Sequence, residues 1–241
     1  MKEKKSRKII QWALVPLVPL VIIGGYFWPR LGYLPLVMMV IMLFTSLFRG
    51  RFYCGWLCAM GAFHERVVAR FSLKKKMLPV FKARWFRWLI FILMMSLFAA
   101  RLGLADGDPD KTGAVFVMMW TLSTGIALAL GLIWKPKSWC SFCPMATFQG
   151  NVSPCQYLLQ VADSCKGCGI CHKLCPLETN PGSFKAQGFV KSLDCMRCST
   201  CVLNCPKKAL EFKSASKSQC AVLTQLGLRP LLKNEELKSK N

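Results

Sequence analysis

Eight cysteines in the last third of the chain stand at one spacing that occurs twice, and thiolates at such a spacing are ligands for iron. The first run has the form C-x2-C-x2-C-x3-C-P and consists of Cys165, Cys168, Cys171 and Cys175, followed by Pro176. The second run has the same form and consists of Cys195, Cys198, Cys201 and Cys205, followed by Pro206. Two identical runs predict two iron–sulfur clusters.

The spacing also predicts which cysteines share a cluster. In bacterial ferredoxins that carry this run twice, the fourth cysteine of each run ligates the other cluster. We therefore expect one [4Fe–4S] cluster on Cys165, Cys168, Cys171 and Cys205. The second [4Fe–4S] cluster is expected on Cys195, Cys198, Cys201 and Cys175.

Other uses of these cysteines fit the pattern less well. A disulfide framework needs an oxidising compartment, and a zinc site is usually built from two C-x2-C pairs. Cys168, Cys171 and His172 also match C-x-x-C-H, the attachment motif of c-type haem, but haem would consume two cluster ligands. We therefore interpret His172 as an ordinary solvated side chain.

Four further cysteines form two close pairs. Cys54 and Cys58 follow the second apolar run of the chain, and Cys140 and Cys143 follow the fourth. If those runs are membrane-crossing helices, both pairs lie on one side of the membrane and at one depth. Four thiolates gathered there are candidate ligands for a metal or a third cluster, or form a redox-active dithiol pair. The alternative is that they are reduced, buried cysteines that behave as small apolar residues.

The segments around the two pairs resemble each other. An aromatic residue precedes the first cysteine of each pair, Tyr53 in one and Trp139 in the other. This similarity indicates an internal repeat of a helix followed by a cysteine motif. Of the remaining cysteines, Cys155 is a candidate substitute for one of the four, and Cys220 is expected to be a spare thiol.

The chain before residue 135 is much more apolar than a ferredoxin requires. The protein has 241 residues, of which 54% are hydrophobic, and its long apolar runs cover residues 9–28, 31–48, 88–104 and 114–134. A membrane-spanning helix needs about 20 such residues. The first run is expected to be an uncleaved span, because it is long and ends without the small-residue site of a signal peptide. Pro16 and Pro19 predict kinks in it.

Positive charge stands where membrane topology requires it. The formal net charge is +22, and Lys and Arg concentrate in the N-terminus, in residues 49–87 and after Trp134. This bias predicts a multi-pass protein of the bacterial inner membrane with both termini in the reducing cytoplasm. The positive charge does not indicate nucleic-acid binding, because the basic residues are not interleaved with aromatic residues as in RNA-binding sheets. Arg101, near the outer end of the third span, is expected to reach the interface or to pair with Asp106.

The predicted fold is an all-α membrane core of four transmembrane helices plus a small α+β domain of the bacterial two-[4Fe–4S] ferredoxin type. Gly182 and Gly188 indicate turns between its two cysteine runs. The predicted parts are a basic cytoplasmic N-terminus (1–8), the four-helix domain with both helix-end motifs (9–150), a linker (151–162), the ferredoxin-like domain (163–212) and a basic flexible or membrane-surface tail (213–241).

The paired helix-end motifs ahead of two ferredoxin runs resemble the membrane-bound polyferredoxins of the NapH/NosR type, which include the CcoG-like proteins. Such proteins carry two C-x3-C-P motifs at the cytoplasmic ends of transmembrane helices. The resemblance covers roughly residues 9–212. This chain departs from the pattern at two places, because Ala59 replaces the proline after Cys58 and only two residues separate Cys140 from Cys143.

The main hypothesis is an electron-transfer protein of the inner membrane. It would pass electrons between the cytoplasmic [4Fe–4S] clusters and a membrane quinone or a redox partner protein. His64 is a candidate for a quinone or proton step, although a lone interfacial histidine is more often structural. The sequence contains no hydrolytic or group-transfer motif, and it identifies no catalytic residue.

The alternative hypothesis, which the CcoG-like resemblance implies, is a metal-handling assembly factor for a respiratory enzyme. The helix-end thiols would then reduce or deliver a metal such as copper. Copper(I) prefers soft thiolate and thioether ligands, and Met60 and Met145 stand beside the two motifs. A subunit that only anchors a larger complex, or a membrane regulator, is a third possibility.

Overall fold

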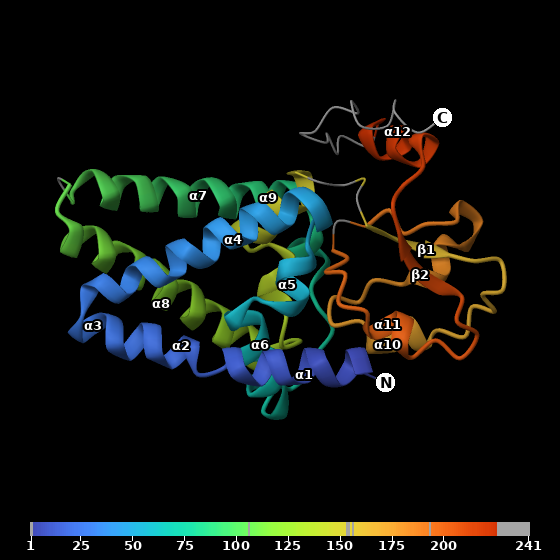
Figure 1. Ribbon diagram of the computed structural model, residues 1–241, viewed down its shortest axis with the longest axis horizontal. Helices are drawn as coiled ribbons and strands as arrows, with labels where there is room; N and C mark the ends of the chain where they lie inside the picture. Colours follow the sequence, from blue (N-terminus) through green and yellow to red (C-terminus); the bar gives the residue numbers. More distant parts are fainter. Residues whose placement is uncertain (1, 106, 153–154, 156, 193, 226–241) are drawn as a thin grey trace.

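The computed structural model describes residues 2–105, 107–152, 155, 157–192 and 194–225. The described elements form a bundle of long helices and a smaller module of short strands and helices. These two parts lie at opposite ends of the long axis in Figure 1.

Four helical segments are long and apolar enough to cross a membrane. They cover Lys5–Phe27, Pro29–Arg49, Arg84–Gly103 and Pro109–Ile133, and each contains one of the four predicted apolar runs or most of it. At most 22% of the most apolar window of each segment is buried inside the described chain. Large apolar surfaces of this kind are rare on a soluble monomer and typical of helices that face lipid.

The first of these segments is interrupted where proline is present. It consists of α1 (Lys2–Leu14), α2 (Leu17–Pro19), the π-helix η1 (Leu20–Gly24) and α3 (Gly25–Phe27). The α-helix stops just before Pro16, and the π-helix begins just after Pro19, because proline has no amide hydrogen to donate. These are the two positions where the sequence predicts kinks.

Short turns join the first apolar segment to the second and the third to the fourth. The 3₁₀ helix η2 (Pro29–Gly32) leads into α4 (Tyr33–Arg49), and α7 (Arg84–Gly103) is followed by α8 (Pro109–Ile133). The backbone of η2 touches α8 so closely that a Cβ on Gly32 would lie 2.0 Å from the Gly113 carbonyl oxygen. Asp108 caps α8 by accepting the Asp110 amide at 3.0 Å. Asp106 lies outside the described residues, so its expected pairing with Arg101 stays a prediction.

Short elements occupy the end of the bundle that faces the smaller module. They are α5 (Phe52–Trp56), α6 (Ala59–Arg66), η3 (Val68–Arg70), η4 (Pro79–Lys82), η5 (Ser138–Ser141) and α9 (Pro144–Val152). Two helix-end cysteines lie within these elements, Cys54 in α5 and Cys140 in η5, whereas Cys58 and Cys143 directly precede α6 and α9. The chain enters α1, leaves α4, enters α7 and leaves α8 at this same end (Figure 1).

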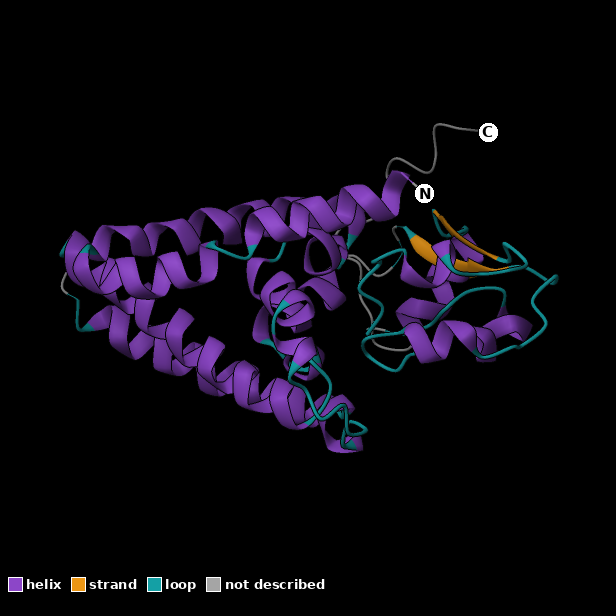
Figure 2. Ribbon diagram, turned by 90° about the horizontal axis from the view of Figure 1, so that it is seen from below, coloured by secondary structure: helices purple, strands orange, loops and turns teal. Residues whose placement is uncertain are grey.

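The smaller module is built around a two-stranded antiparallel sheet, shown in orange in Figure 2. Strand β1 (Leu158–Val161) pairs with β2 (Leu210–Lys213), with Leu159 opposite Phe212. Three short helices complete it, namely α10 (Ile170–Leu174), the 3₁₀ helix η6 (Pro181–Gln187) and α11 (Thr200–Leu203). Gly188 has a left-handed φ of 73° and ends η6, as expected for a turn, whereas Gly182 lies inside that helix.

The end of the chain differs from the expected flexible tail. Helix α12 (Lys217–Gln225) follows β2, and Leu223 is buried against Leu158 and Phe189. Cys220 forms a disulfide with Cys155. The expectations of a spare thiol at Cys220 and of a substitute ligand at Cys155 are therefore wrong. The amphipathic spacing that places Leu223 inward is too short and weak to identify from sequence, and residues 226–241 lie outside the described chain.

Candidate functional site

The four helix-end cysteines come together, as the topology predicts. Cys54, Cys140 and Cys143 all pack in one apolar cluster, whose buried members include Met77 and Met196. Burial raises the pKa of the Cys58 thiol, and the neighbouring thiols of Cys54, Cys140 and Cys143 raise it further. The pKa of Cys143 is likewise raised to about 11, chiefly by burial. Metal binding at this site must therefore displace thiol protons.

The second cysteine of each pair caps a helix. Cys58 stands at the N-terminus of α6 and accepts the Gly61 amide on its sulfur at 3.4 Å. Cys143 stands directly before α9, and the Ala146 amide three residues on lowers the pKa of its thiol. Both sulfurs thus lie at the positive end of a helix dipole, where a thiolate is stabilised.

The two motifs make the same turn despite their different spacing. The Cys58 amide donates to the Tyr53 carbonyl at 3.0 Å, across five residues. The Cys143 amide donates to the Trp139 carbonyl at 2.9 Å, across four residues. The turn of the second motif is therefore one residue shorter, but in both motifs the amide of the second cysteine donates to the carbonyl of the aromatic residue before the first. The internal repeat seen in the sequence thus extends to the hydrogen bonding.

Buried positive charge surrounds the helix-end thiols. Burial raises the pKa of the Cys54 thiol, while Arg51 and Lys137 counteract part of that shift. The Arg51 guanidinium also donates to the Cys140 carbonyl at 2.7 Å. Lys137 is 1% exposed and pairs with Glu65 at 2.5 Å. These cations are suited to balance the negative charge of a thiolate-bound metal group.

The two ferredoxin runs fold alike. The residues at matching positions after each cysteine have left-handed φ, as in the pairs Gly167 and Arg197, Gly169 and Ser199, and Glu178 and Lys208. The Thr179 amide donates to the Cys175 sulfur at 3.3 Å, and the Ala209 amide donates to the Cys205 sulfur at 3.4 Å. Such amide-to-sulfur bonds stabilise cluster ligands and tune their reduction potential.

The environment of Cys175 agrees with the predicted exchange of ligands between runs. Burial raises the pKa of the Cys201 thiol, and the thiols of Cys195, Cys198 and Cys175 raise it further. Cys175 therefore lies near the thiols of the second run. One apolar cluster, formed by the buried side chains of Leu159, Val161, Val190 and Leu210, contacts cysteines of both runs, namely Cys165, Cys171, Cys195, Cys201 and Cys205.

The donors fit an iron–sulfur cluster in kind. Each expected set consists of four cysteines, and thiolates are the ligands that hold such clusters. Among the described residues, no group of three or more His, Cys, Asp or Glu side chains lies close enough together to hold a single metal ion.

The second ferredoxin run and the helix-end set adjoin each other. Cys175 and Met196 belong to the same apolar cluster as Cys54. A Cβ on Gly55 would lie 2.5 Å from the Met196 carbonyl oxygen and 3.1 Å from the Cys198 Cβ. Only glycine allows this approach, which the sequence alone does not reveal.

Charged side chains hold the two parts together. Asp194, beside Cys195, pairs with Arg87 at 2.7 Å and with Arg51 at 3.9 Å. Arg197 is buried and donates to the Arg49 carbonyl at the end of α4. Burial lowers the pKa of Arg197 to about 10, so the guanidinium stays charged at neutral pH.

The other candidate residues lie away from the thiols or serve the fold. His64 is 2% exposed, its Nδ1 lies 2.8 Å from the Met60 carbonyl oxygen, and burial lowers its pKa. Met60 packs against the aromatic cluster of Trp139 and Phe142, which Cys143 also contacts. His172 is exposed, as expected.

Sequence reasoning missed several neighbours of the helix-end site. Besides Arg51 and Lys137, they include Gln149, which accepts the Cys54 thiol at 2.9 Å, and Met77, which packs in the same cluster. Gln149 and Lys137 lie close in sequence to the second motif, and this closeness is the one sequence signal that could identify them.

Two family models match the chain. The model of a family described as "4Fe-4S binding domain" matches residues 31–77 and 116–156, which contain all four helix-end cysteines. The model described as "4Fe-4S dicluster domain" matches residues 157–206, which contain both ferredoxin runs. The chain is thus an iron–sulfur protein with ferredoxin-like 4Fe–4S binding domains.

Two similar proteins of Methanocaldococcus jannaschii have no described function. Uncharacterized protein MJ0749 is 26% identical over 74% of this chain and 71% of its own length. Uncharacterized protein MJ0750 is 26% identical over 75% of this chain and 79% of its own length. No solved structure matches the chain.

Proposed function

We propose that the protein passes electrons between [4Fe–4S] clusters at the cytoplasmic face of a bacterial inner membrane and a membrane quinone or a redox partner protein. The observation that carries this proposal is the shared apolar cluster of Cys54, Cys140, Cys143 and Cys175. Through the packing of Met196, this cluster joins the end of the helical bundle to the second ferredoxin run. The proposal places the chain among polyferredoxins of the NapH/NosR type.

Twelve cysteines would hold three clusters. The first two sets are those assigned from the ferredoxin runs, and the third consists of Cys54, Cys58, Cys140 and Cys143. When bound, such clusters supply one-electron exchange over a wide range of potentials. The protein's own residues set the environment of each, through amide-to-sulfur bonds, burial and nearby charge.

The four apolar segments and the distribution of charge support the proposed membrane location. Their apolar side chains face outward, and the basic residues gather at the end that carries the cysteines. The positive-inside rule assigns that end to the cytoplasm. There thiols stay reduced and available for iron. The Cys155–Cys220 disulfide is unusual for that compartment, and it uses neither a ferredoxin nor a helix-end cysteine.

Iron analysis combined with low-temperature EPR tests the proposal. Anaerobically purified protein should contain about twelve irons, as three [4Fe–4S] clusters require. Cys143→Ser should remove about four irons and one EPR signal, whereas the matched substitution Cys220→Ser should leave iron content unchanged. About eight irons in the wild-type protein would reject the third cluster. Stoichiometric copper that is lost in Cys54→Ser would support the metal-handling alternative instead.

A further inference from the structure

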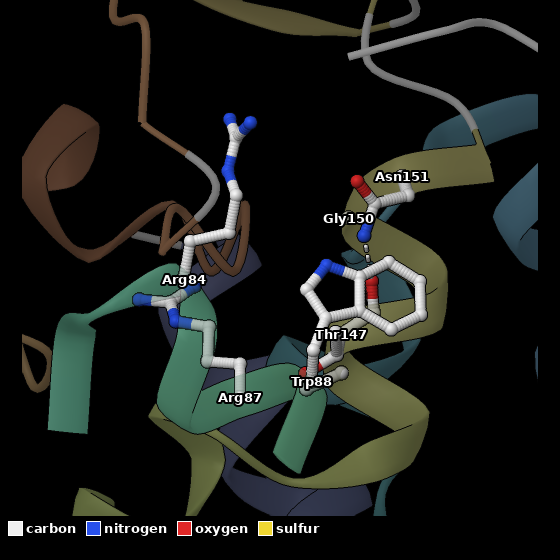
Figure 3. Close-up of a pocket in the computed structure, with 7 residues that line it drawn as sticks. Arg84, Arg87, Trp88, Thr147, Gly150 and Asn151 are labelled. Atoms are coloured by element: carbon white, nitrogen blue, oxygen red, sulfur yellow. Dashed lines mark hydrogen bonds between the residues drawn. The ribbon is translucent and has the colours of Figure 1, made fainter. Parts of the chain in front are cut away.

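A pocket opens where α7 begins, beside the helix-end site. It is lined by Arg84, Arg87, Trp88, Ala146, Thr147, Gly150 and Asn151, and its empty volume is about 430 Å³ including the opening to solvent. Figure 3 shows Trp88 between the two arginines and the α9 residues. Neither the cluster ligands nor the proposed electron path uses the polar groups that line it.

The polar groups of the pocket suit an anion. Two arginines are among the residues that line it, and arginine binds phosphate oxygens through paired hydrogen bonds. Arg87 is 6% exposed, and its Nε has no hydrogen-bond partner among the described residues, although another nitrogen of the same group pairs with Asp194. On the opposite wall, the side-chain amide of Asn151 donates to the Thr147 carbonyl at 2.7 Å, so this donor already has a partner within the chain.

The face of α7 that leads away from the pocket suits a lipid. Arg84, Trp88 and Ile92 stand four residues apart and therefore lie on one face of the helix. Trp88 and Ile92 are exposed, at 43% and 62%. Along this face a cation is followed by an interfacial aromatic and then by an aliphatic side chain. A phospholipid presents its phosphate, glycerol region and acyl chain in the same order.

The connection between α6 and α7, at the same end of the bundle, is also basic and apolar. In it the exposed side chains of Phe71 and Leu73 are followed by the exposed lysines 74–76. Such segments lie on anionic membrane surfaces, where each basic residue contributes about 1 kcal/mol of attraction.

We infer that this pocket binds the phosphate of an anionic phospholipid headgroup, with the acyl chains along Trp88 and Ile92. Arg87 joins the pocket to Asp194, the residue before Cys195, so a bound lipid also supports the contact between the bundle and the ferredoxin module. The inference rests on the proposed membrane location, and it does not depend on how many clusters are bound.

Binding of defined lipids to the detergent-purified, cluster-loaded protein tests the inference. Phosphatidylglycerol should raise the thermal unfolding midpoint and remain bound in native mass spectrometry, whereas phosphatidylcholine should do neither. Arg84→Gln should weaken phosphatidylglycerol binding about tenfold or more, as the loss of a charged hydrogen bond implies. Arg101→Gln, at the other end of the same helix, should leave binding unchanged.

Several outcomes would overturn the inference. Inorganic phosphate that stabilises the protein as well as phosphatidylglycerol would identify a small-anion site, and displacement of the lipid by a short-chain quinone would identify a redox site. Equal losses in Arg84→Gln and Arg101→Gln would indicate unspecific charge attraction. If Arg84→Gln does not fold, Arg84→Lys is the substitute, because lysine keeps the charge but lacks the planar guanidinium group. This variant should still lose the preference for phosphatidylglycerol over phosphatidylcholine. Visible absorbance of the clusters, recorded in parallel, separates failure of lipid binding from failure of cluster loading.

Discussion

Glu65 pairs with two buried cations, of which Lys137 also acts on the helix-end thiols. Its carboxylate pairs with Arg7 at 2.6 Å and with Lys137 at 2.5 Å, and it also accepts the Gln11 amide. Burial by itself would raise the pKa of Glu65, but the charges of Lys137 and Arg7 hold it at about 2. The group therefore stays ionised at any pH at which the clusters survive.

Replacing Glu65 should destabilise the protein in a pH-dependent way. Because Glu65→Gln leaves Lys137 buried without its counter-charge, we expect a loss of about 2–3 kcal/mol in the free energy of unfolding at pH 7. The folded-state pKa lies below the ordinary value of 4.5, so the contribution is complete above pH 4.5 and is lost as the pH falls towards 2.

Thermal unfolding of both proteins between pH 8 and pH 3 measures this difference. The gap between their midpoints should be constant down to about pH 4.5 and then narrow. Glu211→Gln is the matched control, because Glu211 pairs with Lys213 on the exposed surface and should change stability little. A gap that persists to pH 3 would contradict the assigned role.

At the scale of elements, the sequence predicts the spans well and the short elements poorly. A long apolar run identifies a long apolar helix almost alone, so the four apolar helical segments and the interruptions at Pro16 and Pro19 could be predicted. Strand β1 lies in the range expected as a linker. It has four residues, and its pairing with β2 depends on contacts about fifty residues away. Periodicity cannot reveal such an element.

The candidate site also has one part that the sequence predicts and one that it does not. Cysteine spacing predicts which thiols gather, because each ferredoxin motif closes within a few residues. The partners of those thiols, such as Gln149 at Cys54, come from packing between distant segments and have no local signature. The departure at Ala59 is also explained by geometry, since α6 begins at this residue and a first helical position accepts either alanine or proline.

Ala59→Pro should therefore preserve the helix-end site. Proline suits the first position of a helix, as Pro144 does in α9, and the extended backbone of Cys58 suits a residue before proline. We expect iron content to be unchanged and the free energy of unfolding to change by less than about 1 kcal/mol.

Gly61→Pro is the informative comparison for that substitution. It removes the amide that donates to the Cys58 sulfur, so about four irons should be lost. Gly61→Ala keeps the amide and should retain them. Loss of iron in all three variants would show that the turn tolerates no change and that the hydrogen bond is not the decisive feature.

At the scale of the whole molecule, function depends on how the ferredoxin module meets the bundle. The contact combines the ion pairs of Asp194, the insertion of Arg197 at the end of α4 and the close approach at Gly55. The first two are attractive, and the third sets how near the second ferredoxin run can lie to the helix-end thiols. Electron exchange falls steeply with distance, so the approach at Gly55 is the feature with the largest expected effect on rate.

Gly55→Ala should separate the two parts while leaving each intact. The added Cβ would lie 2.5 Å from the Met196 carbonyl oxygen, a distance that forces the backbones apart and costs about 1–3 kcal/mol. Iron content should remain that of the wild-type protein, while the magnetic interaction between reduced clusters weakens in the EPR spectrum. Gly125→Ala in α8 is the matched control, because a Cβ there meets nothing within 4 Å. If both variants show the wild-type interaction, the glycine contact does not set the distance between the cysteine sets, and the proposed path through Cys54 and Cys175 loses its support.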